Sequence, residues 1–330
     1  AGIKPVELTA KEGLALINGT QVMTSIGALT LYDSINLIKH ADITAALTIE
    51  ALNGIIDAYH YKVHMVRPHK GQISTAKNLL KLLEGSKMTT KQGEVRVQDA
   101  YALRCIPQIH GASRDALDYV LDKVLIEFNS ATDNPLIFTD SKEVISGGNF
   151  HGQPMALSFD FLGIALSEIA NISERRLERL VNPALSGLPA FLTRKGGLNS
   201  GFMIVQYSAA SLVSENKILA HPASVDSIPS SANQEDHVSM GTIAARKSRE
   251  ILNNSRKVLA MELLAACQAI DLRGKKTLGK GTEVAYNIIR ECIPEVEEDR
   301  VMYKDINTCE DIIKSNEILN KVQEKIGNLL

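Results

Sequence analysis

The stretch SSANQEDHVSMGTIAARKSREILNNSRKVLAMELLAACQAI, residues 230–270, decides the fold prediction because it joins a polar loop to a long helical pattern. Five polar residues run from Asn233 to His237, after a lead-in rich in proline and serine. The apolar spacing that follows predicts a helix over residues 235–270. Polar side chains at such a junction are either helix caps or groups placed where free N–H donors and the helix dipole favour a binding site. Both interpretations remain open on this stretch alone.

The rest of the chain repeats the helical pattern and has almost no strand pattern. Apolar helical spacing extends from the N-terminal region to about Leu52, and it returns after Pro154 and after Phe202. We therefore predict an all-α fold, a bundle of long, largely apolar helices with shorter C-terminal helices. Residues 1–270 are expected to form the central long-helix bundle with the candidate site, and residues 271–330 a helical region packed on it.

Two helices are expected to be buried nearly all round because few of their positions are charged. The first follows Pro154, and the second spans residues 202–220. The second carries Glu215 and Lys217, and charged groups in a buried helix need partners. One chain would leave much of this apolar surface bare, so we expect an oligomer.

The bulk composition narrows the class of protein. The 330 residues carry a net charge of −2, which does not favour binding to nucleic acid or to an anionic membrane. No apolar run is expected to be long enough to span a bilayer. The four cysteines lack CxxC spacing, which favours a reducing, cytoplasmic location over a zinc site or a disulfide framework. The first residue is Ala1 rather than Met, which predicts a processed product or a fragment.

Several local motifs are candidates for chemistry. The triplet from Asn18 to Thr20 interrupts an apolar helical pattern, as a kink or a site does. Tyr101 and Arg104 are three residues apart, so a helix places them on one face, where a guanidinium fork can hold a carboxylate. An arginine on a solvated surface is the ordinary alternative. Residues 146–152 form a glycine-rich turn that lets the backbone approach another group closely.

A metal site is not predicted. His60 and His64 are four residues apart and could share a helix face, but Tyr61 stands where the zinc-protease motif needs glutamate. No third ligand is evident nearby in the sequence.

Five motifs together resemble the histidine ammonia-lyases, which belong to the aromatic amino acid lyase family. They occur in that family's order and extend the resemblance over the whole chain. They are ALINGTQ at 15–21, VQDAYALRC at 97–105, SGGNFHGQP at 146–154, NSGFMI at 199–204 and SANQEDHVSMG at 231–241.

The resemblance implies elimination of ammonia from an amino acid with the help of a methylidene-imidazolone (MIO) electrophile. The family forms this group from its own Ala-Ser-Gly. Matched motif by motif, Asn18 lies beside the electrophile and Tyr101 is a catalytic residue. Arg104 grips the substrate carboxylate, and Gln98 supports these residues.

The same resemblance implies that Phe150 packs on the substrate and that Glu235 contacts its imidazole or acts as a base. Phenylalanine and tyrosine lyases look to have Gln at the position of Glu235. A carboxylate suits an imidazole N–H and is left unpaired against a phenyl ring. Histidine, giving urocanate, is therefore the expected substrate, and a phenylalanine or tyrosine lyase or aminomutase is the alternative.

The chain departs from the family at one point, because it contains no Ala-Ser-Gly. We expect the MIO-forming segment to be an N-terminal part absent from this chain, either removed or supplied separately, and the chain alone to be inactive. The expected assembly is a homotetramer, with no nucleic acid or membrane partner. A non-catalytic helical scaffold or amino-acid binder is the second hypothesis. A fumarase-type lyase is the third, and the absence of its GSS-containing loop disfavours it.

Overall fold

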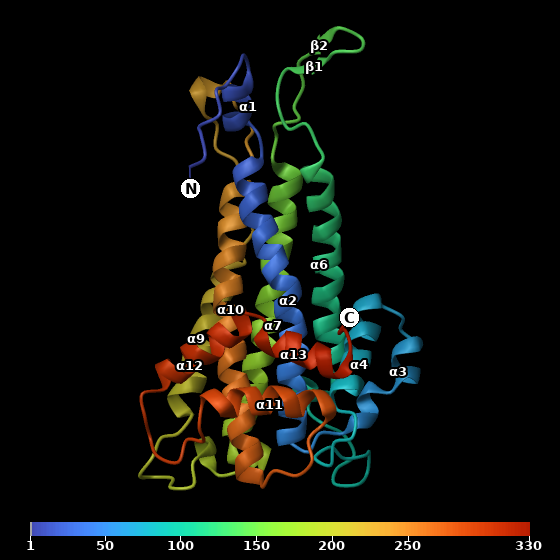
Figure 1. Ribbon diagram of the computed structural model, residues 1–330, viewed down its shortest axis with the longest axis vertical. Coiled ribbons are helices and arrows are strands. Elements are labelled where there is room, and N and C mark those ends of the chain that lie inside the picture. Colours follow the sequence, from blue (N-terminus) through green and yellow to red (C-terminus); the bar gives the residue numbers. More distant parts are fainter. Residues whose placement is uncertain (1) are drawn as a thin grey trace.

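The computed structural model describes residues 2–330 and contains long helices joined by loops at the two ends of a bundle (Figure 1). The helices are α1 (Glu12–Asn18), α2 (Gln21–Ala51), α3 (Tyr61–Met65), α4 (Lys70–Leu82), α5 (Tyr101–Arg104), α6 (Ile106–Phe128), α7 (Gln153–Val181), α8 (Pro183–Ser186), α9 (Met203–Leu219), α10 (Gly241–Arg273), α11 (Lys280–Cys292), α12 (Met302–Lys314) and α13 (Glu317–Ile326). Short 3₁₀ turns are η1 (Ile56–Tyr59), η2 (Ala190–Leu192) and η3 (Ser231–Asn233). The strands are β1 (Leu136–Phe138) and β2 (Glu143–Ile145).

Helices α2, α6, α7 and α10 lie side by side and form the bundle, so the all-α prediction is confirmed (Figure 1). The most extensive packing joins α10 to α7 and to α2, and α9 covers part of the outer side of α7 and α10. Within residues 2–330 the strands form only one antiparallel hairpin, with Leu136 opposite Ile145. The hairpin and α1 lie at one end of the bundle, and α3, α4 and α11 lie toward the other (Figure 1).

Helix α7 is buried on one side and exposed on the other. The apolar positions that follow Pro154 at helical spacing are fully buried in the core: Met155, Phe159, Leu162, Leu166 and Ile169. Leu157, Phe161 and Ile164 lie on the opposite side and are exposed. The expectation of burial all round was wrong for a single chain, because the other helices cover that face only in part: the ring of Phe161 meets Tyr119 of α6 edge to face, with centroids 5.8 Å apart.

Helix α9 departs further from its expected burial, because it packs with one side only. Its buried residues are Val205, Ala209 and Asn216, and Asn216 is hydrogen-bonded to Asn254 at 3.0 Å. Glu215 and Lys217 are exposed. The prediction that both charges are buried was therefore wrong in this chain, although Glu215 does meet a partner on another helix, accepting from Asn254 of α10 at 3.3 Å.

The start of α10 also differs from its prediction. The helix begins at Gly241 rather than at residue 235, and it ends at Arg273, followed by Gly274 at φ 79°. Residues 231–233 have φ between 49° and 70° and turn the chain away from a helical path. The residues from Asn233 to His237 therefore precede the helix as a loop, and the helix-start interpretation does not apply to them.

Helix α7 is long and apolar enough, by length and composition, to cross a bilayer. The expectation that no such run exists was wrong on that criterion. The bent pair α1–α2 passes the same test if it is taken as one segment. Most of the apolar window of α7 is buried against other helices, as in the core helix of a bundle.

The C-terminal helices lie across the side of the bundle (Figure 1). Helix α12 packs on α10, and α11 packs on α13, α2 and α4. His40 of α2 is fully buried beneath them and contacts Asn316 between α12 and α13, with 3.3 Å between Nε2 and Oδ1. The division into residues 1–270 and 271–330 stays a prediction.

A buried carboxylate joins three of the long helices. Glu262 of α10 is fully buried and accepts hydrogen bonds from Arg176 Nε at 2.5 Å and from Arg176 Nη2 at 2.8 Å. It also accepts from Thr48 of α2 at 2.7 Å and from Ser173 of α7 at 2.6 Å. Four donors satisfy most of the acceptor capacity of a carboxylate, which offsets the cost of burying the charge.

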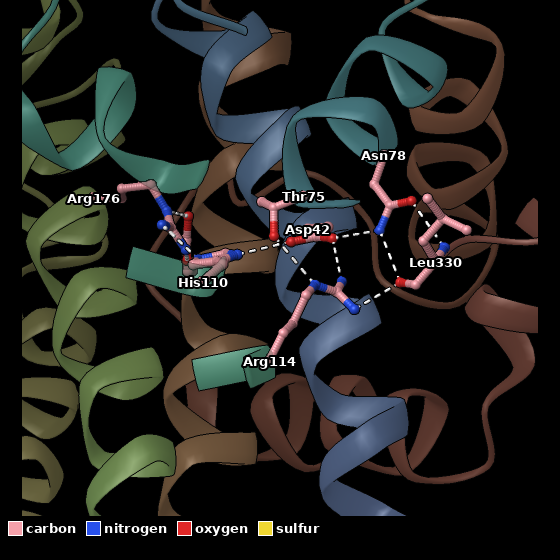
Figure 2. Close-up of polar contacts among 8 residues, drawn as sticks. Asp42, Thr75, Asn78, His110, Arg114, Arg176 and Leu330 are labelled. Carbon is pink, nitrogen blue, oxygen red and sulfur yellow. Dashed lines mark hydrogen bonds and ion pairs between the residues drawn. The ribbon is translucent and has the colours of Figure 1, made fainter. Parts of the chain in front are cut away.

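A second ion pair continues this network through α6 (Figure 2). Asp42 of α2 pairs with Arg114 and accepts from His110 Nδ1 at 2.8 Å. Arg176 Nη1 lies 3.4 Å from the other ring nitrogen of His110, so the imidazole bridges the two pairs. Burial lowers the pKa of His110, which keeps it neutral between two acids and two arginines.

The network extends to the last residue of the sequence (Figure 2). Arg114 Nη1 donates to the Leu330 carbonyl at 2.6 Å, and the amide of Asn78 bonds both the N–H and the carbonyl of Leu330. Burial by itself raises the pKa of Asp42, but Arg114 and hydrogen bonds from His110 and Asn78 bring it below its ordinary value.

We predict that Glu262→Ala destabilises the protein by about 3–5 kcal/mol, because it leaves the guanidinium of Arg176 buried without its partner. The measurement is the urea midpoint of unfolding. The matched control is Glu84→Ala, which removes an exposed pair with Lys280 and should leave the midpoint nearly unchanged. Equal shifts for the two variants would contradict the argument from burial.

We predict that stability falls as the pH is lowered from about 6.5 to about 4, partly through His40. Burial lowers the pKa of His40 to about 4, an effect that Arg256 increases and the contact with Asn316 opposes. The unfolded chain binds this proton near pH 6.5, so the contribution, about 3 kcal/mol, is complete above that pH and is lost on acidification. His40→Gln should flatten the dependence of the unfolding free energy on pH in this window. An unchanged slope would show that His40 is not responsible.

Candidate functional site

The predicted site residues lie in two groups at opposite ends of the bundle. Asn18 precedes the first residue of α2, whereas residues 98–104 are bonded to the segment after its last residue. A helix of 31 residues is about 45 Å long. Phe150 and Glu235 belong to loops at the end of Asn18, because they precede α7 and α10, which run down from that end (Figure 1). One chain therefore does not bring the predicted residues together.

Tyr101 and Arg104 lie on one face of α5, as their spacing predicts. The guanidinium carbon of Arg104 is 4.8 Å from the centroid of the Tyr101 ring, within the range of a cation–π contact. Tyr101 is 70% exposed, and Gln98 is exposed in the loop before it. Arg104 Nε is buried and has no hydrogen-bond partner among residues 2–330. A planar cation with an unused donor is suited to binding a carboxylate.

Two buried residues that the sequence analysis did not select hold α5 in place. Asp99 accepts from the Ile55 backbone N–H at 2.6 Å and from Arg96 Nε at 2.5 Å. The hydroxyl of Tyr59 donates to the Leu103 carbonyl at 3.0 Å, and burial raises the pKa of this phenol. The available sequence signal for Asp99 was its position inside the motif VQDAYALRC. No motif in the sequence marked Tyr59.

Glu235 lies in a tight loop that is strained. The backbones of Ser230 and Glu235 pair with each other at 3.0 Å, and Ser230 Oγ lies 3.3 Å from the carboxylate. Ser231, Ala232 and Asn233 between them have φ of 49°, 55° and 70°, in the left-handed region. Each such residue costs about 1–2 kcal/mol. A run of three non-glycine residues in this conformation is a feature of functional loops rather than of simple helix caps.

Phe150 lies at the end of the glycine-rich turn and is 39% exposed. The turn is anchored to the segment after α6, because Asn134 Oδ1 accepts from the Gly147 N–H at 2.7 Å and from Ser146 Oγ at 3.1 Å. The next residue, His151, contacts His237 on the loop of Glu235. The two loops that carry Phe150 and Glu235 are therefore in direct contact.

Asn18 is the last residue of α1 and is exposed. The break after it separates α1 from α2, as the polar triplet predicts, and Thr20 donates to Glu127 of α6 at 2.5 Å. A cavity of about 440 Å³ opens at this junction, and Thr24 lies in its wall. The hydroxyl of Thr24 is buried without a partner among residues 2–330. Another polar group can therefore be accommodated next to Thr24.

The histidines at 60 and 64 do not share a helix face, so that possibility was wrong. His60 precedes α3 as its N-cap and accepts from the Lys62 N–H at 3.3 Å. His64 uses both nitrogens, one with the Ala58 carbonyl at 3.1 Å and one with Gln72 at 3.0 Å. Within residues 2–330, no group of three or more potential His, Cys, Asp or Glu ligands lies together.

The NSGFMI motif is held by the acidic run near the C-terminus. Both carboxylate oxygens of Asp299 accept backbone hydrogen bonds, from Ser200 at 2.7 Å and from Gly201 at 2.8 Å. Glu295 and Glu298 contact the basic pair just before the motif, Arg194 and Lys195. The acidic run lies about a hundred residues from the motif in the sequence, so no local pattern signals the contact.

Comparisons with known proteins match this arrangement to one family. The family model described as aromatic amino acid lyase matches residues 1–291. The chain is 72% identical to a histidine ammonia-lyase of Alkaliphilus oremlandii over 99% of its length, and 68% identical to one of Alkaliphilus metalliredigens over 100%. It spans 64% and 65% of those two proteins.

Solved structures agree with this match. A histidine ammonia-lyase from Trypanosoma cruzi superimposes with a TM-score of 0.91 at 46% identity, over 98% of this chain and 62% of that one. A tyrosine aminomutase from Streptomyces globisporus gives 0.96 at 41% identity, over 100% of this chain and 67% of that one. The chain belongs to the aromatic amino acid lyase family.

Proposed function

We propose that the complete protein is a histidine ammonia-lyase, which eliminates ammonia from L-histidine to give urocanate. The observation that carries the proposal is the 72% identity, over nearly the whole chain, to a protein of that name. An exposed carboxylate at Glu235 and an arginine with an unused donor at Arg104 add support, because histidine offers an imidazole and a carboxylate. The chain spans about two thirds of its relatives, so the proposal concerns the whole protein.

At one half of the site, Arg104 binds the substrate carboxylate through its planar fork. Tyr101, stacked against that guanidinium, lies beside the reacting carbons and acts in proton transfer there. Gln98 supports the pair from the preceding loop. Asp99 and Tyr59 fix α5, so both groups approach the substrate from a rigid element.

At the other half, Glu235 accepts a hydrogen bond from the imidazole N–H or takes a proton from the substrate, and Phe150 packs on the ring. Both side chains are exposed to solvent in the single chain and free to meet a ligand. The second candidate is a phenylalanine or tyrosine lyase or aminomutase. The similarity to the tyrosine aminomutase of Streptomyces globisporus, at 41% identity, supports testing this second candidate.

The MIO group, when present, supplies the electrophile that makes the amino group of the substrate a better leaving group. The 330 residues contain no Ala-Ser-Gly, so we propose that residues outside this sequence form it. Asn18 would donate a hydrogen bond to that group. The cavity at the junction of α1 and α2, with the buried hydroxyl of Thr24 in its wall, fits the approach of a further polar segment.

We further propose a homotetramer in which each site is completed by more than one chain. The two groups of site residues are separated by the length of α2, so one chain cannot close on a small substrate. The exposed apolar side chains of α7 and α9 offer surface for helix packing between chains: Leu157, Phe161, Ile164, Ile204, Tyr207 and Ile218. A cytoplasmic location fits the four free cysteines.

We predict that Arg104→Ala and Glu235→Gln in the complete protein have different substrate profiles. Losing a charged hydrogen bond costs roughly 1.5–3 kcal/mol, or about 10–150-fold. Arg104→Ala should lower kcat/KM for every amino acid substrate alike. Glu235→Gln keeps the shape of the side chain but removes its charge, so it should lower kcat/KM for histidine far more than for tyrosine or phenylalanine.

The assay follows urocanate by its ultraviolet absorbance, in protein whose MIO group is verified by mass spectrometry. A wild-type protein that carries MIO and converts tyrosine but not histidine would favour the second candidate. MIO-containing protein without activity on any aromatic amino acid would favour a binding scaffold. An equal loss for all substrates in Glu235→Gln would show that Glu235 does not recognise the imidazole.

We predict that two impaired variants complement each other when they share one oligomer. Co-expressed Arg104→Ala and Glu235→Ala chains should recover part of the wild-type activity, because some sites then receive both intact residues from different chains. The control is each variant expressed alone, and sedimentation checks that all samples have the same oligomeric state. Absence of recovery in verified mixed oligomers would place both residues in one chain's site.

A further inference from the structure

A histidine pair links the two loops that precede α7 and α10. His151 lies in the loop before α7 and His237 in the loop before α10, with ring centroids 5.5 Å apart and planes inclined by 26°. The Nε2 atom of His151 is 3.2 Å from the carbonyl oxygen of His237 and 3.4 Å from its Nδ1. Neither imidazole takes part in the proposed reaction.

The hydrogen bonds define the tautomer of His151. Its Nδ1 accepts from the backbone N–H of Gln153 at 3.4 Å, so Nδ1 carries no proton. A neutral imidazole then has its proton on Nε2, and this N–H donates to the carbonyl of His237. One ring thus connects the first turn of α7 to the loop of Glu235, with a donor and an acceptor in fixed positions.

Two more contacts connect the same loops with the segment after α9. The side chain of Gln153 donates to the Ser224 carbonyl at 2.8 Å, and Ser227 Oγ accepts from the Val238 N–H at 2.9 Å. The contact between His151 and the His237 carbonyl therefore lies between two residues that are themselves hydrogen-bonded to this segment, Gln153 and Val238. The loops before α7 and α10 form one hydrogen-bonded unit.

Close backbone packing beneath the pair leaves the unit little room to shift. A Cβ atom built on Gly152 would lie 2.6 Å from Met23 Sδ and 2.8 Å from Ser239 Oγ. One built on Gly241 would lie 2.4 Å from the same sulfur. The two glycines let both helix starts pack against one side chain of α2. The histidine pair is then the polar contact that sets how one loop sits on the other.

We propose that His151 is a positioning residue, which acts through His237 to fix the loop of Glu235 relative to Phe150. The inference rests on the proposed function for the identity of the substrate. Phe150 is the immediate neighbour of His151, and Glu235 is two residues from His237. A displacement of about 1 Å between groups that hold one substrate lowers the rate strongly.

The kinetic test uses the complete protein with its MIO group verified. His151→Ala removes both hydrogen bonds and should lower kcat/KM for histidine by about tenfold. His151→Gln keeps an amide N–H₂ at the position of Nε2 and should recover most of that loss. The loss should appear in kcat as well as in KM, because a displaced Glu235 holds the substrate less tightly and in a less productive position.

A second variant separates the ring of His237 from its backbone carbonyl. The N–H of His151 donates to that carbonyl, which alanine keeps, so His237→Ala should lower kcat/KM far less than His151→Ala. His221→Ala is the matched control, an exposed histidine on the segment after α9, and it should leave kcat/KM unchanged. A loss in either variant as large as that in His151→Ala, or no recovery in His151→Gln, would overturn the proposal.

Hydrogen exchange gives a readout that does not depend on the substrate. In His151→Ala the amides of residues 234–240, including that of Val238, should exchange faster, while those in the middle of α10 should not change. Unchanged exchange in the loop would overturn the link between the loops even in an active enzyme. Faster exchange in a protein that converts no histidine would instead count against the proposed function and leave the link intact.

Discussion

The fold depends on a buried carboxylate with four donors. Glu262 lies inside α10, and its oxygens bind Arg176 and Ser173 of α7 and Thr48 of α2. Removing Glu262 or Arg176 leaves an uncompensated charge in the core. The network therefore fixes the position of the three helices relative to one another along their axes. His110 extends this constraint to α6 and Asp42 (Figure 2). The long helices can therefore present loops at both ends of the bundle with little relative movement.

This rigidity has a functional consequence, because the predicted site residues lie at the two ends of the same long helices. The length of α2 separates Asn18 from Arg104, and no bend in a bundle held by buried ion pairs closes that gap. This separation is the reason the proposed chemistry is assigned to an assembly of chains. Such an assembly would also explain why exposed apolar side chains persist along α7 and α9, where a single chain gains nothing from them.

The sequence predicted the helices well because apolar periodicity reports directly on burial. The five positions from Met155 to Ile169 are buried as their spacing predicts, and the break at Asn18 is present. The start of α10 was misplaced by six residues, because no propensity rule anticipates three successive left-handed residues at 231–233. Glu215 and Lys217 were misjudged because composition does not tell an outer helix from an inner one.

The sequence revealed the candidate site only through its motifs. The contacts that support these motifs join residues that are distant in the sequence. The support of α5 by Tyr59 and the binding of Ser200 by Asp299 leave no periodic signal. Buried polar groups without a hydrogen-bond partner give a further indication of where the site lies. Seven buried side-chain N or O atoms within residues 2–330 lack a hydrogen-bond partner, and two of them, Arg104 Nε and Thr24 Oγ1, lie at opposite ends of α2. An unsatisfied buried group costs about 1–3 kcal/mol, which a ligand or a neighbouring segment can recover. At these two positions the proposed site needs another molecule, so its binding there can recover part of that free energy.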